Sequence, residues 1–331
     1  MKREIGGFFE LWLKKKGEYH NNALGLNSGR SAFAYILKVK SVRKIYLPCY
    51  CCDALLEPLH SLGIEYEFYS INKSLEPIFS KKLRKDEFIL YINYFGICDK
   101  IVRNVSDRFN NVVVDNSQAF FSKPLKETDT FYSPRKFFGV ADGGYLYTNK
   151  HMTDKLFRDL SYERYLYLLK RIDTTAQEAY NLYLDNERNI STLPLSRMSK
   201  ITKLILSSID YSSAKKTRTD NFYFLHTRLN NMNEFRIRTG NIFGPHVYPF
   251  LINIDGLREY LISKKIYVAT YWREVMTRAD ASSPEYYLSK YLIPLPVDQR
   301  YNDSDMLRIY ETTKKFMKVH CRTKTAYQWL S

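Results

Sequence analysis

The chain has 331 residues, 45% of them hydrophobic and 26% charged, with 51 Lys and Arg against 35 Asp and Glu. This length accommodates one large α/β domain and a smaller one. No apolar run of about 18 or more residues is present, so we expect no membrane-spanning helix. The net charge of +16 suggests anionic partners: phosphorylated small molecules, nucleic acid or a membrane surface. Because the basic residues are scattered, we interpret most of them as a solvated surface.

The cysteines indicate a reducing environment. Three of the five lie in the segment PCYCC at residues 48–52, too close together for a disulfide framework. A metal site would need a second Cys or His pair at suitable spacing, and only His60 lies nearby. We therefore predict reduced cysteines, no metal site and a cytoplasmic protein. The apolar stretch near the N-terminus is interrupted by Glu10 and no cleavage site follows it, so we expect no secretion signal.

The first half of the chain alternates expected strands with expected helices. A polar turn at residues 27–29 precedes a predicted helix over 30–40. Further helices are expected at 53–62 and 99–109, and strands at 44–47, 66–69, 88–93, 112–114, 129–132 and 145–148. This order indicates a mainly parallel sheet covered by helices. Right-handed crossovers would place the ends of the strands at 47, 93 and 114 along one edge, where such sheets bind ligands.

The second half of the chain is predicted to be mostly helical at first and mixed later. Helical composition extends over residues 152–189, a loop follows at 190–196, and a long helical stretch covers 198–231. Beyond Gly240 we expect strands at 247–254 and 266–270 and helices at 255–264 and 303–317. The sequence therefore predicts a large α/β domain over residues 1–239, including interface helices, and a smaller C-terminal α/β domain over residues 240–331.

The segment 112–148 carries the residues best suited to chemistry. A β-branched run ends in Asp115, and Lys136 follows Pro134 on a short loop bounded by glycines. An acid at the carboxyl end of a buried strand lies where α/β sheets place ligands. A lysine delivered nearby can form a Schiff base with a carbonyl or with pyridoxal phosphate (PLP).

This pattern resembles the DegT/DnrJ/StrS family of PLP-dependent sugar aminotransferases. That family closes one strand with a D-x-x-Q segment, matched here by Asp115 and Gln118. It carries the cofactor lysine on a Pro-x-Lys segment before glycine-rich turns, matched here by Pro134 and Lys136. The likeness extends over residues 5–301. It implies the fold of PLP-dependent transferases of fold type I, PLP as the cofactor and a homodimer with shared active sites.

The resemblance also implies a role for each matched residue. Lys136 would form the internal aldimine with PLP and carry a proton during turnover. Asp115 would pair with the pyridine nitrogen, and Gln118 would donate to the phenolic oxygen of the ring. Without the resemblance, Lys136 reads as a surface lysine next to Arg135, and the other two residues read as strand-end and turn caps.

A cofactor phosphate would bind at the start of the predicted helix over 30–40, where free backbone N–H groups favour anions. The family uses a Gly-Thr pair there, and this chain has Gly29 and Arg30, followed by Ser31. An ordinary helix N-cap is the alternative interpretation. Ser133 is a candidate for a second phosphate contact, because Phe131 stands where the family usually has a serine.

Two further positions depart from the family pattern. Leu195 stands where the family often has an asparagine that reaches the phosphate of the partner subunit. Cys52, which we include among the cofactor-binding candidates, stands where an aromatic ring often stacks on the cofactor. The loss of neutral hydrogen bonds at such positions costs about 1 kcal/mol each.

These observations support three hypotheses about function. The first is a PLP-dependent aminotransferase that moves an amino group from an amino acid, glutamate, to a keto sugar linked to a nucleotide. Retention of lysine favours transamination over the dehydration catalysed by family members with histidine at this position. The second is a PLP-fold binding or regulatory protein with little turnover, suggested by Phe131, Leu195 and Cys52. The third, nucleic-acid binding, rests on net charge alone, and we predict small-molecule partners and no nucleic acid.

Overall fold

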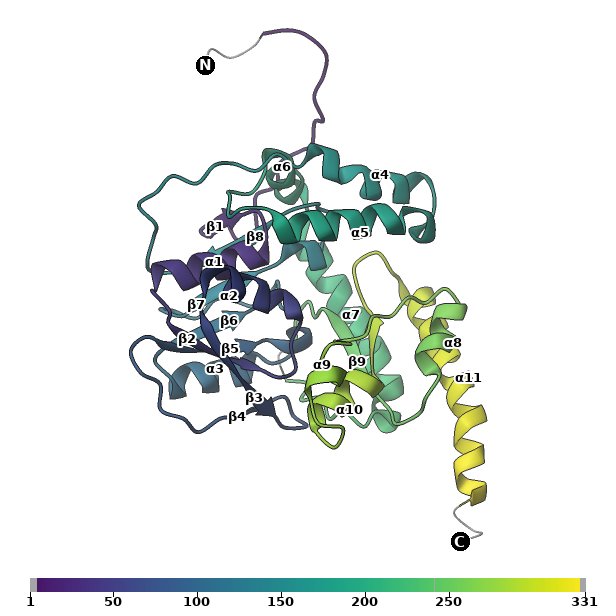
Figure 1. The fold of residues 1–331 in the computed structure, drawn as a ribbon. Coiled ribbons are helices and arrows are strands. Elements are labelled where there is room, and N and C mark those ends of the chain that lie inside the picture. Colours follow the sequence, from purple (N-terminus) through teal and green to yellow (C-terminus); the bar gives the residue numbers. More distant parts are fainter. Residues whose placement is uncertain (1–4, 241, 328–331) are drawn as a thin grey trace.

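The computed structural model describes residues 5–240 and 242–327, with side chains placed as far as His320. Its larger part is built on an eight-stranded sheet with the order β1-β8-β7-β6-β5-β2-β3-β4 (Figure 1). The strands are β1 (Leu24–Leu26), β2 (Lys44–Pro48), β3 (Glu65–Ile71), β4 (Pro77–Ile78), β5 (Glu87–Ile92), β6 (Val112–Asp115), β7 (Asp129–Tyr132) and β8 (Gly144–Tyr147). The pairs from β7 to β3 are parallel, and the outer pairs are antiparallel. The predicted mainly parallel sheet is confirmed.

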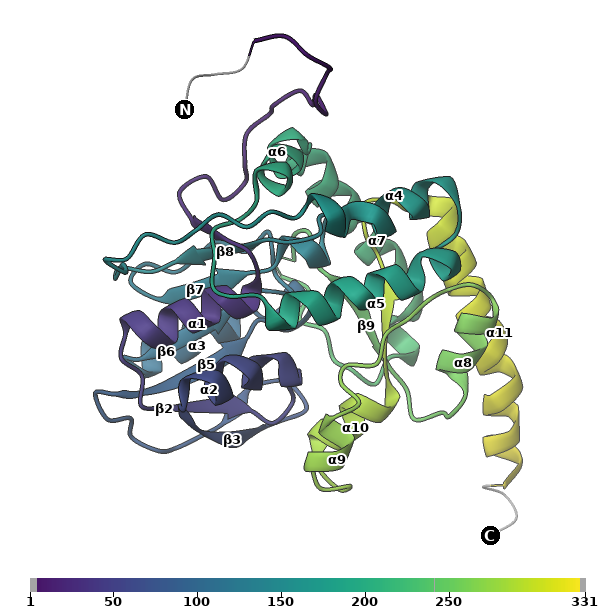
Figure 2. The same ribbon diagram turned by 45° about the horizontal axis from the view of Figure 1, so that its top comes forward.

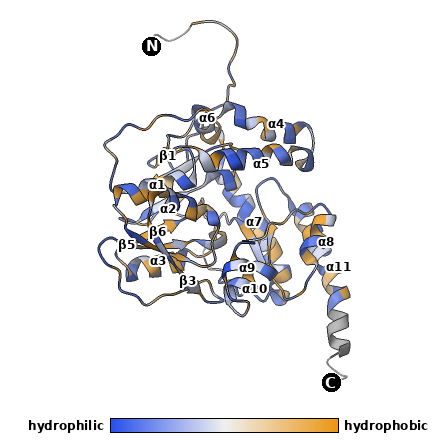
Figure 3. Cartoon of the chain, in the orientation of Figure 1, coloured by the Kyte–Doolittle hydropathy of each residue, from blue (hydrophilic) through white to orange (hydrophobic). Residues whose placement is uncertain are grey.

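Helices cover this sheet as the alternating pattern predicted. Helices α1 (Gly29–Val39) and α2 (Leu56–Leu62) lie side by side in both ribbon views, and α3 (Asp99–Arg108) contacts β5 and β6 (Figures 1 and 2). Every residue of β5 and of β6 is buried. Strands that are buried along their whole length are typical of a parallel sheet covered on both faces, and Figure 3 shows hydrophobic residues along the strands of this sheet.

One glycine allows the first helix to lie against the sheet. A Cβ atom on Gly144 would lie 2.3 Å from the carbonyl oxygen of Ser28 and 2.9 Å from the backbone nitrogen of Gly29. No larger residue fits there, so β8 passes directly beneath the start of α1. The N-terminus of that helix is thereby held next to β7 and β8.

Four helices follow the sheet in the chain: α4 (Leu166–Asp173), α5 (Ala176–Thr192), α6 (Lys200–Ser208) and α7 (Tyr211–Leu229). Helices α4 and α5 form an antiparallel pair above the sheet (Figure 1). The prediction of one long helical stretch over 198–231 was wrong at its centre. The chain breaks between α6 and α7 because Asp210 caps the second helix, accepting a hydrogen bond from the backbone nitrogen of Ser213 at 3.0 Å.

The C-terminal part has a sheet of its own. Strands β9 (Val247–Leu251) and β10 (Leu292–Pro296) pair antiparallel, and α8 (Leu257–Ser263), α9 (Val275–Arg278), α10 (Pro284–Tyr291) and α11 (Asp303–Tyr327) accompany them. A hydrophobic core separate from that of the large sheet joins α7, β9, α8, β10 and α11. The boundary at residue 240 stays a prediction, and positions 241 and 328–331 of the predicted domain lie outside the described residues.

Two local predictions need correction. Residues 266–270 have no regular secondary structure, although Ile266 and Val268 are buried in the alternation of a strand. Their backbone finds other partners, because the Arg258 guanidinium donates to the carbonyl oxygen of Ala269. The closing helix also continues past residue 317, as far as Tyr327. Within the described residues, no helix combines the length and the apolar character needed to cross a membrane.

Candidate active site

The carboxyl ends of β5 and β6 bring the predicted acid and amide together. Asp115 is the last residue of β6 and is buried, and its Oδ1 accepts a hydrogen bond from the backbone nitrogen of Ser117 at 2.7 Å. Burial raises the pKa of Asp115, and the positive charge of Lys136 opposes that shift. Asp115 and Lys136 therefore lie close enough to interact electrostatically.

Lys136 ends a single helical turn, Pro134–Lys136, which begins with proline because proline is pre-organised for a first helical position. Its side chain is exposed, and it makes no hydrogen bond or ion pair with the residues that the structure describes. Burial raises the pKa of Cys52, and the charge of Lys136 opposes part of that shift. The same charge contributes to the lowered pKa of His246. The lysine thus stands at the edge of a buried polar group of residues.

Gln118 presents an amide group that is only half used. Its Oε1 accepts a hydrogen bond from the backbone nitrogen of Phe95 at 2.8 Å. Its Nε2 is buried and has no partner among the described residues. A buried donor without an acceptor is costly, so this atom is suited to a ligand oxygen.

The start of α1 lies against two serines from other segments. A Cβ atom on Gly29 would lie 3.6 Å from Ser117 Oγ and 3.7 Å from Ser133 Cβ. Ser28 caps the helix, its Oγ accepting from the backbone nitrogen of Ser31 at 3.0 Å. Free N–H groups at a helix start together with two hydroxyl groups suit a phosphate. Sequence reasoning missed Ser117, although it lies between Asp115 and Gln118 in the D-x-x-Q segment.

The departures at residues 30 and 131 have different consequences. The Arg30 side chain lies toward α2, where its Nε pairs with Glu57 at 2.7 Å, so only its backbone belongs to the helix start. Phe131 is buried and stacks on Phe33, with ring centroids 5.7 Å apart. Phe131 therefore offers no hydroxyl group, whereas Ser133, directly after the end of β7, does.

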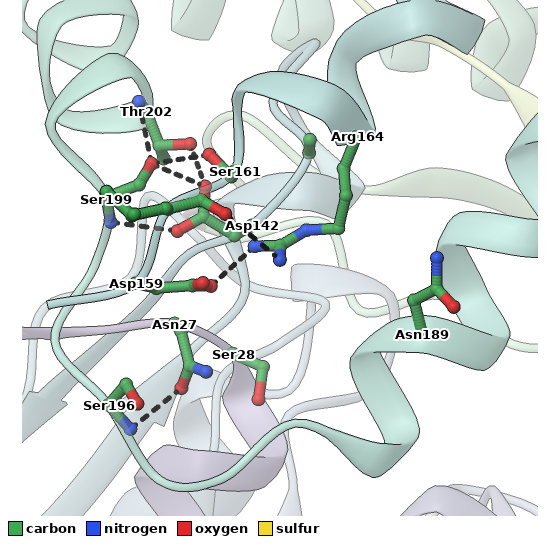
Figure 4. Close-up of polar contacts among 12 residues, drawn as sticks. Asn27, Ser28, Asp142, Asp159, Ser161, Arg164, Asn189, Ser196, Ser199 and Thr202 are labelled. Atoms are coloured by element: carbon green, nitrogen blue, oxygen red, sulfur yellow. Dashed lines mark hydrogen bonds and ion pairs between the residues drawn. The ribbon is translucent and has the colours of Figure 1, made fainter. Parts of the chain in front are cut away.

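The loop that follows Lys136 is anchored to α6. Asp142 is fully buried and accepts hydrogen bonds from the Ser199 backbone nitrogen at 2.9 Å and from Ser199 Oγ at 2.8 Å (Figure 4). Thr202 Oγ1 also donates to it. These donors satisfy the carboxylate in place of a cation. Helices α4 and α5 also hold this loop. Tyr167 OH of α4 donates a hydrogen bond to the carbonyl oxygen of Val140, and Asn186 Nδ2 of α5 donates one to the carbonyl oxygen of Ala141.

A second set of hydrogen bonds ties the chain before α1 to residues 194–196. Asn27 donates from Nδ2 to the carbonyl oxygen of Pro194 at 3.0 Å. Its Oδ1 accepts from the backbone nitrogen of Ser196 at 3.3 Å (Figure 4). Leu195 lies between these anchors and packs against the core of the large sheet. Its aliphatic side chain offers no hydrogen bond to a ligand.

His246 is a polar residue of this region that the sequence analysis did not select. Its Nε2 lies 3.0 Å from Tyr271 OH, and its Nδ1 is buried without a partner among the described residues. Its ring packs on that of Phe137, with centroids 5.2 Å apart. Burial and the charges of Arg218 and Lys136 hold the pKa of His246 well below its usual value, so the ring is neutral. No motif in the sequence marks this residue.

The residues gathered here fit PLP. The ring would find a carboxylate in Asp115 and an unpartnered donor in Gln118, and the phosphate would find the start of α1 with Ser117 and Ser133. Lys136 would supply the amine. Among the described residues, no cluster of three or more His, Cys, Asp or Glu side chains could hold a metal ion.

Solved structures give an independent comparison for this fold. The chain matches a DegT DnrJ EryC1 StrS aminotransferase from Brucella abortus at 15% identity, with a TM-score of 0.63 over 89% of this chain and 85% of the other. It matches PseC from Helicobacter pylori, an aminotransferase of pseudoaminic acid biosynthesis, at 13% identity, with a TM-score of 0.62 over 90% and 87%. The chain has the fold of these aminotransferases.

A third structure, the aminotransferase TlmJ from Streptoalloteichus hindustanus, matches at 13% identity, with a TM-score of 0.64 over 90% of this chain and 86% of the other. Neither a family model nor a curated protein sequence matches the chain. The likeness is therefore one of architecture, and it confirms the predicted PLP-dependent transferase fold.

Proposed function

We propose that the chain is a PLP-dependent aminotransferase that transfers an amino group from an amino acid, glutamate, to a keto sugar linked to a nucleotide. The observation that supports the proposal is that the charge of Lys136 acts on buried Asp115 at one sheet edge, near Gln118, whose Nε2 has no partner among the described residues. The solved structures of this fold include PLP and PMP forms of a sugar aminotransferase from Streptococcus pneumoniae. The net charge of +16 suits an acceptor that carries a diphosphate.

Bound PLP would supply an electron sink for charge that develops on the substrate carbon. Asp115 would keep the ring nitrogen protonated, because a carboxylate favours a cation beside it. Gln118 Nε2 would donate to a ring oxygen and orient the ring. Lys136 Nζ would hold the cofactor in place between turnovers and carry a proton to and from the substrate carbon.

A homodimer would complete the site. Helices α4 and α5 and the segment before them expose large apolar side chains, including Phe157 at 87%, Leu169 at 56% and Ile172 at 80%. The N-terminal arm extends away from the rest of the chain (Figure 1). Its side chains Phe8 and Trp12 are 98% and 80% exposed. Apolar surface on this scale marks an interaction site. Because α4 and α5 hold the loop that carries Lys136, a second copy bound there would shelter that exposed lysine.

A PLP-fold binding protein with little turnover is the second candidate. It is favoured by Leu195 and Phe131, whose apolar side chains stand where the family has polar cofactor contacts. Half-buried Cys52 likewise offers no stacking ring. Ser117 and Ser133 lie next to Gly29 and would supply phosphate contacts in place of the missing ones, and for this reason we favour the enzyme. The cytoplasmic location stays a prediction.

Covalent trapping tests the proposal. Protein incubated with PLP should show a near-ultraviolet to violet absorbance band, and borohydride reduction followed by peptide mass spectrometry should place the cofactor on Lys136. The Lys136→Ala protein should lose this adduct. An equal yield of trapped cofactor in Lys136→Ala, or an adduct on another lysine of the wild type, would refute the assignment.

A further inference from the structure

Helix α7 carries an arginine that is buried and forms no ion pair with a carboxylate among the described residues. Arg218 is 1% exposed. Its Nε donates to Gln299 Oε1 at 2.7 Å, Nη1 to the carbonyl oxygens of Pro245 and His246 at 3.0 and 3.3 Å, and Nη2 to that of Phe137 at 3.3 Å. Burial lowers the pKa of Arg218 to about 10, so the group stays charged at neutral pH.

Burying a charged side chain whose hydrogen bonds all go to neutral groups costs free energy. Apolar residues of similar volume often replace buried charges without loss of stability. The charge of Asp298 opposes the lowering of the pKa of Arg218, but the Asp298 carboxylate accepts its hydrogen bonds from Arg300, at 2.7 and 2.9 Å. The position of Arg218 therefore calls for an explanation in terms of what its five N–H groups hold.

What they hold is the backbone next to Lys136. The carbonyl oxygen of Phe137, the following residue, accepts from Arg218 Nη2 at 3.3 Å and from Gln299 Nε2 at 2.7 Å. Gln299 is itself bonded to Arg218, so the three groups form a closed set. The guanidinium also lies 4.4 Å from the centroid of the Phe137 ring, within the range of a cation–π contact.

The same arginine also connects this loop to Gln118 in the candidate site. Its Nη1 donates to the carbonyl oxygen of His246. The backbone nitrogen of His246 donates to the carbonyl oxygen of Phe95 at 2.8 Å. The backbone nitrogen of Phe95 in turn donates to Gln118 Oε1. An unbroken series of hydrogen bonds thus runs from the lysine loop to the amide expected to orient the cofactor.

We propose that Arg218 is a positioning residue, which fixes the lysine loop relative to Gln118 and joins that loop to the C-terminal part of the molecule. The proposal rests on the proposed function for its meaning, because Lys136 must be held at a set distance from the cofactor. Arg218 touches neither substrate nor cofactor in this account. It acts through the carbonyl groups of Phe137 and His246.

Three variants separate the contributions. Arg218→Met removes the charge and the donors and keeps the length of the side chain. Arg218→Lys keeps the charge, but one ammonium group cannot span acceptors on three segments. Gln299→Leu removes the other donor to Phe137 and leaves the charge intact. Arg258→Met is the control, because the half-buried Arg258 also donates to carbonyl groups, those of Ala269 and Leu292, away from the lysine loop.

The first measurement uses the cofactor-free protein and hydrogen exchange detected by mass spectrometry. Amides of residues 133–141 should exchange about fivefold faster or more in each of the three variants, the factor expected for one lost hydrogen bond. Amides of β5 should be unchanged, and Arg258→Met should leave residues 133–141 as in the wild type. Should Arg218→Met fail to fold, Arg218→Lys and Gln299→Leu decide the result.

The second measurement is the rate at which bound PLP is released. Arg218→Met and Arg218→Lys should both release it about fivefold faster or more, while Arg258→Met should not. Unchanged exchange in folded Arg218 variants would overturn the proposal, as would faster exchange with unchanged release. If the wild type binds no PLP, the proposed function fails, whereas the exchange data still decide whether Arg218 holds the loop.

Discussion

The two sides of the candidate site differ in how far a single chain completes them. On the floor, Asp115, Ser117 and Gln118 are at most 7% exposed, and backbone hydrogen bonds orient both Asp115 and Gln118. On the rim, formed by Lys136 with helices α4 and α5, the lysine is exposed and Ile172 is 80% exposed. The sheet positions the floor residues, whereas this chain leaves Lys136 and the apolar side chains of the rim exposed. This difference predicts that cofactor chemistry depends on the floor and that its shelter depends on a second copy.

The largest expected effect comes from the floor. Asp115→Asn removes the negative charge that would keep the ring nitrogen protonated, and conversion of the PLP form by glutamate should slow about 10²–10³-fold. Stopped-flow absorbance measures this rate. Trapping on Lys136 should persist, because the amine is untouched.

Asp129→Asn is the matched control, since Asp129 is a buried carboxylate at the opposite end of the neighbouring strand, paired with Lys40 at 3.0 Å. Its conversion rate should equal that of the wild type. An Asp115→Asn protein that converts at the wild-type rate would contradict the role given to the floor.

Substitutions on the rim should change the association of two copies of the chain. Leu169→Asp and Ile172→Asp place charges on the exposed apolar surface of α4, and each should weaken the dimer about 10–100-fold, because burial of such a side chain contributes about 1.5–3 kcal/mol. Sedimentation over a range of concentrations measures the change. Leu307→Asp, which alters an exposed leucine of α11, should leave the association unchanged. A wild-type protein that is monomeric at high concentration would remove the proposed second copy.

A smaller effect tests the phosphate end of the floor. Ser117→Ala and Ser133→Ala should each weaken PLP binding about tenfold, since a hydrogen bond to a charged group contributes about 1.5 kcal/mol. Binding of pyridoxal, which has no phosphate, should hardly change. Ser289→Ala serves as control, because Ser289 is a buried serine of α10 far along the chain from these residues. Equal losses for PLP and pyridoxal would place both serines elsewhere in the site.

A separate effect, on stability and not on the cofactor, concerns the aromatic cluster that contains His20. Burial lowers the pKa of His20 to about 4, and its Nε2 lies 2.8 Å from the carbonyl oxygen of Phe120. Below pH 6.5 the unfolded chain takes up a proton that the folded chain takes up only near pH 4. As the pH is lowered from 6.5 to 4, the free energy of unfolding should therefore decrease by about 1.4 kcal/mol per pH unit for this group.

Urea unfolding at pH 7, 6 and 5 measures the slope, which should be shallower for His20→Gln than for the wild type. His60→Gln is the control, because His60 is exposed. An identical slope in His20→Gln would show that His20 is protonated in the folded protein.

The comparison of floor and rim also explains what could be predicted from the sequence. The floor strands carry β-branched runs that end in polar residues, so the position of Asp115 followed from local pattern and strand order. Strand β10 was not predicted because its sequence, LIPLP, contains two prolines. Residues 266–270 alternate as a strand does, but neighbouring segments take up their backbone groups in another way.

Residues that act through tertiary contacts were out of reach. Ser117 reaches Gly29 only because Gly144 lets α1 lie on β8. Arg218 and His246 come from segments far from Lys136 in sequence, and their hydrogen bonds run to carbonyl groups that any residue could supply. Such contacts leave no side-chain pattern by which a single sequence could reveal them.

The reaction of the PLP-loaded protein with glutamate tests the central claim most directly. The account predicts that the absorbance band of the bound aldehyde form is replaced by that of the amine form, with one 2-oxoglutarate released per cofactor. A band that persists for hours in excess glutamate, on protein that retains PLP on Lys136, would contradict an aminotransferase and leave a binding protein.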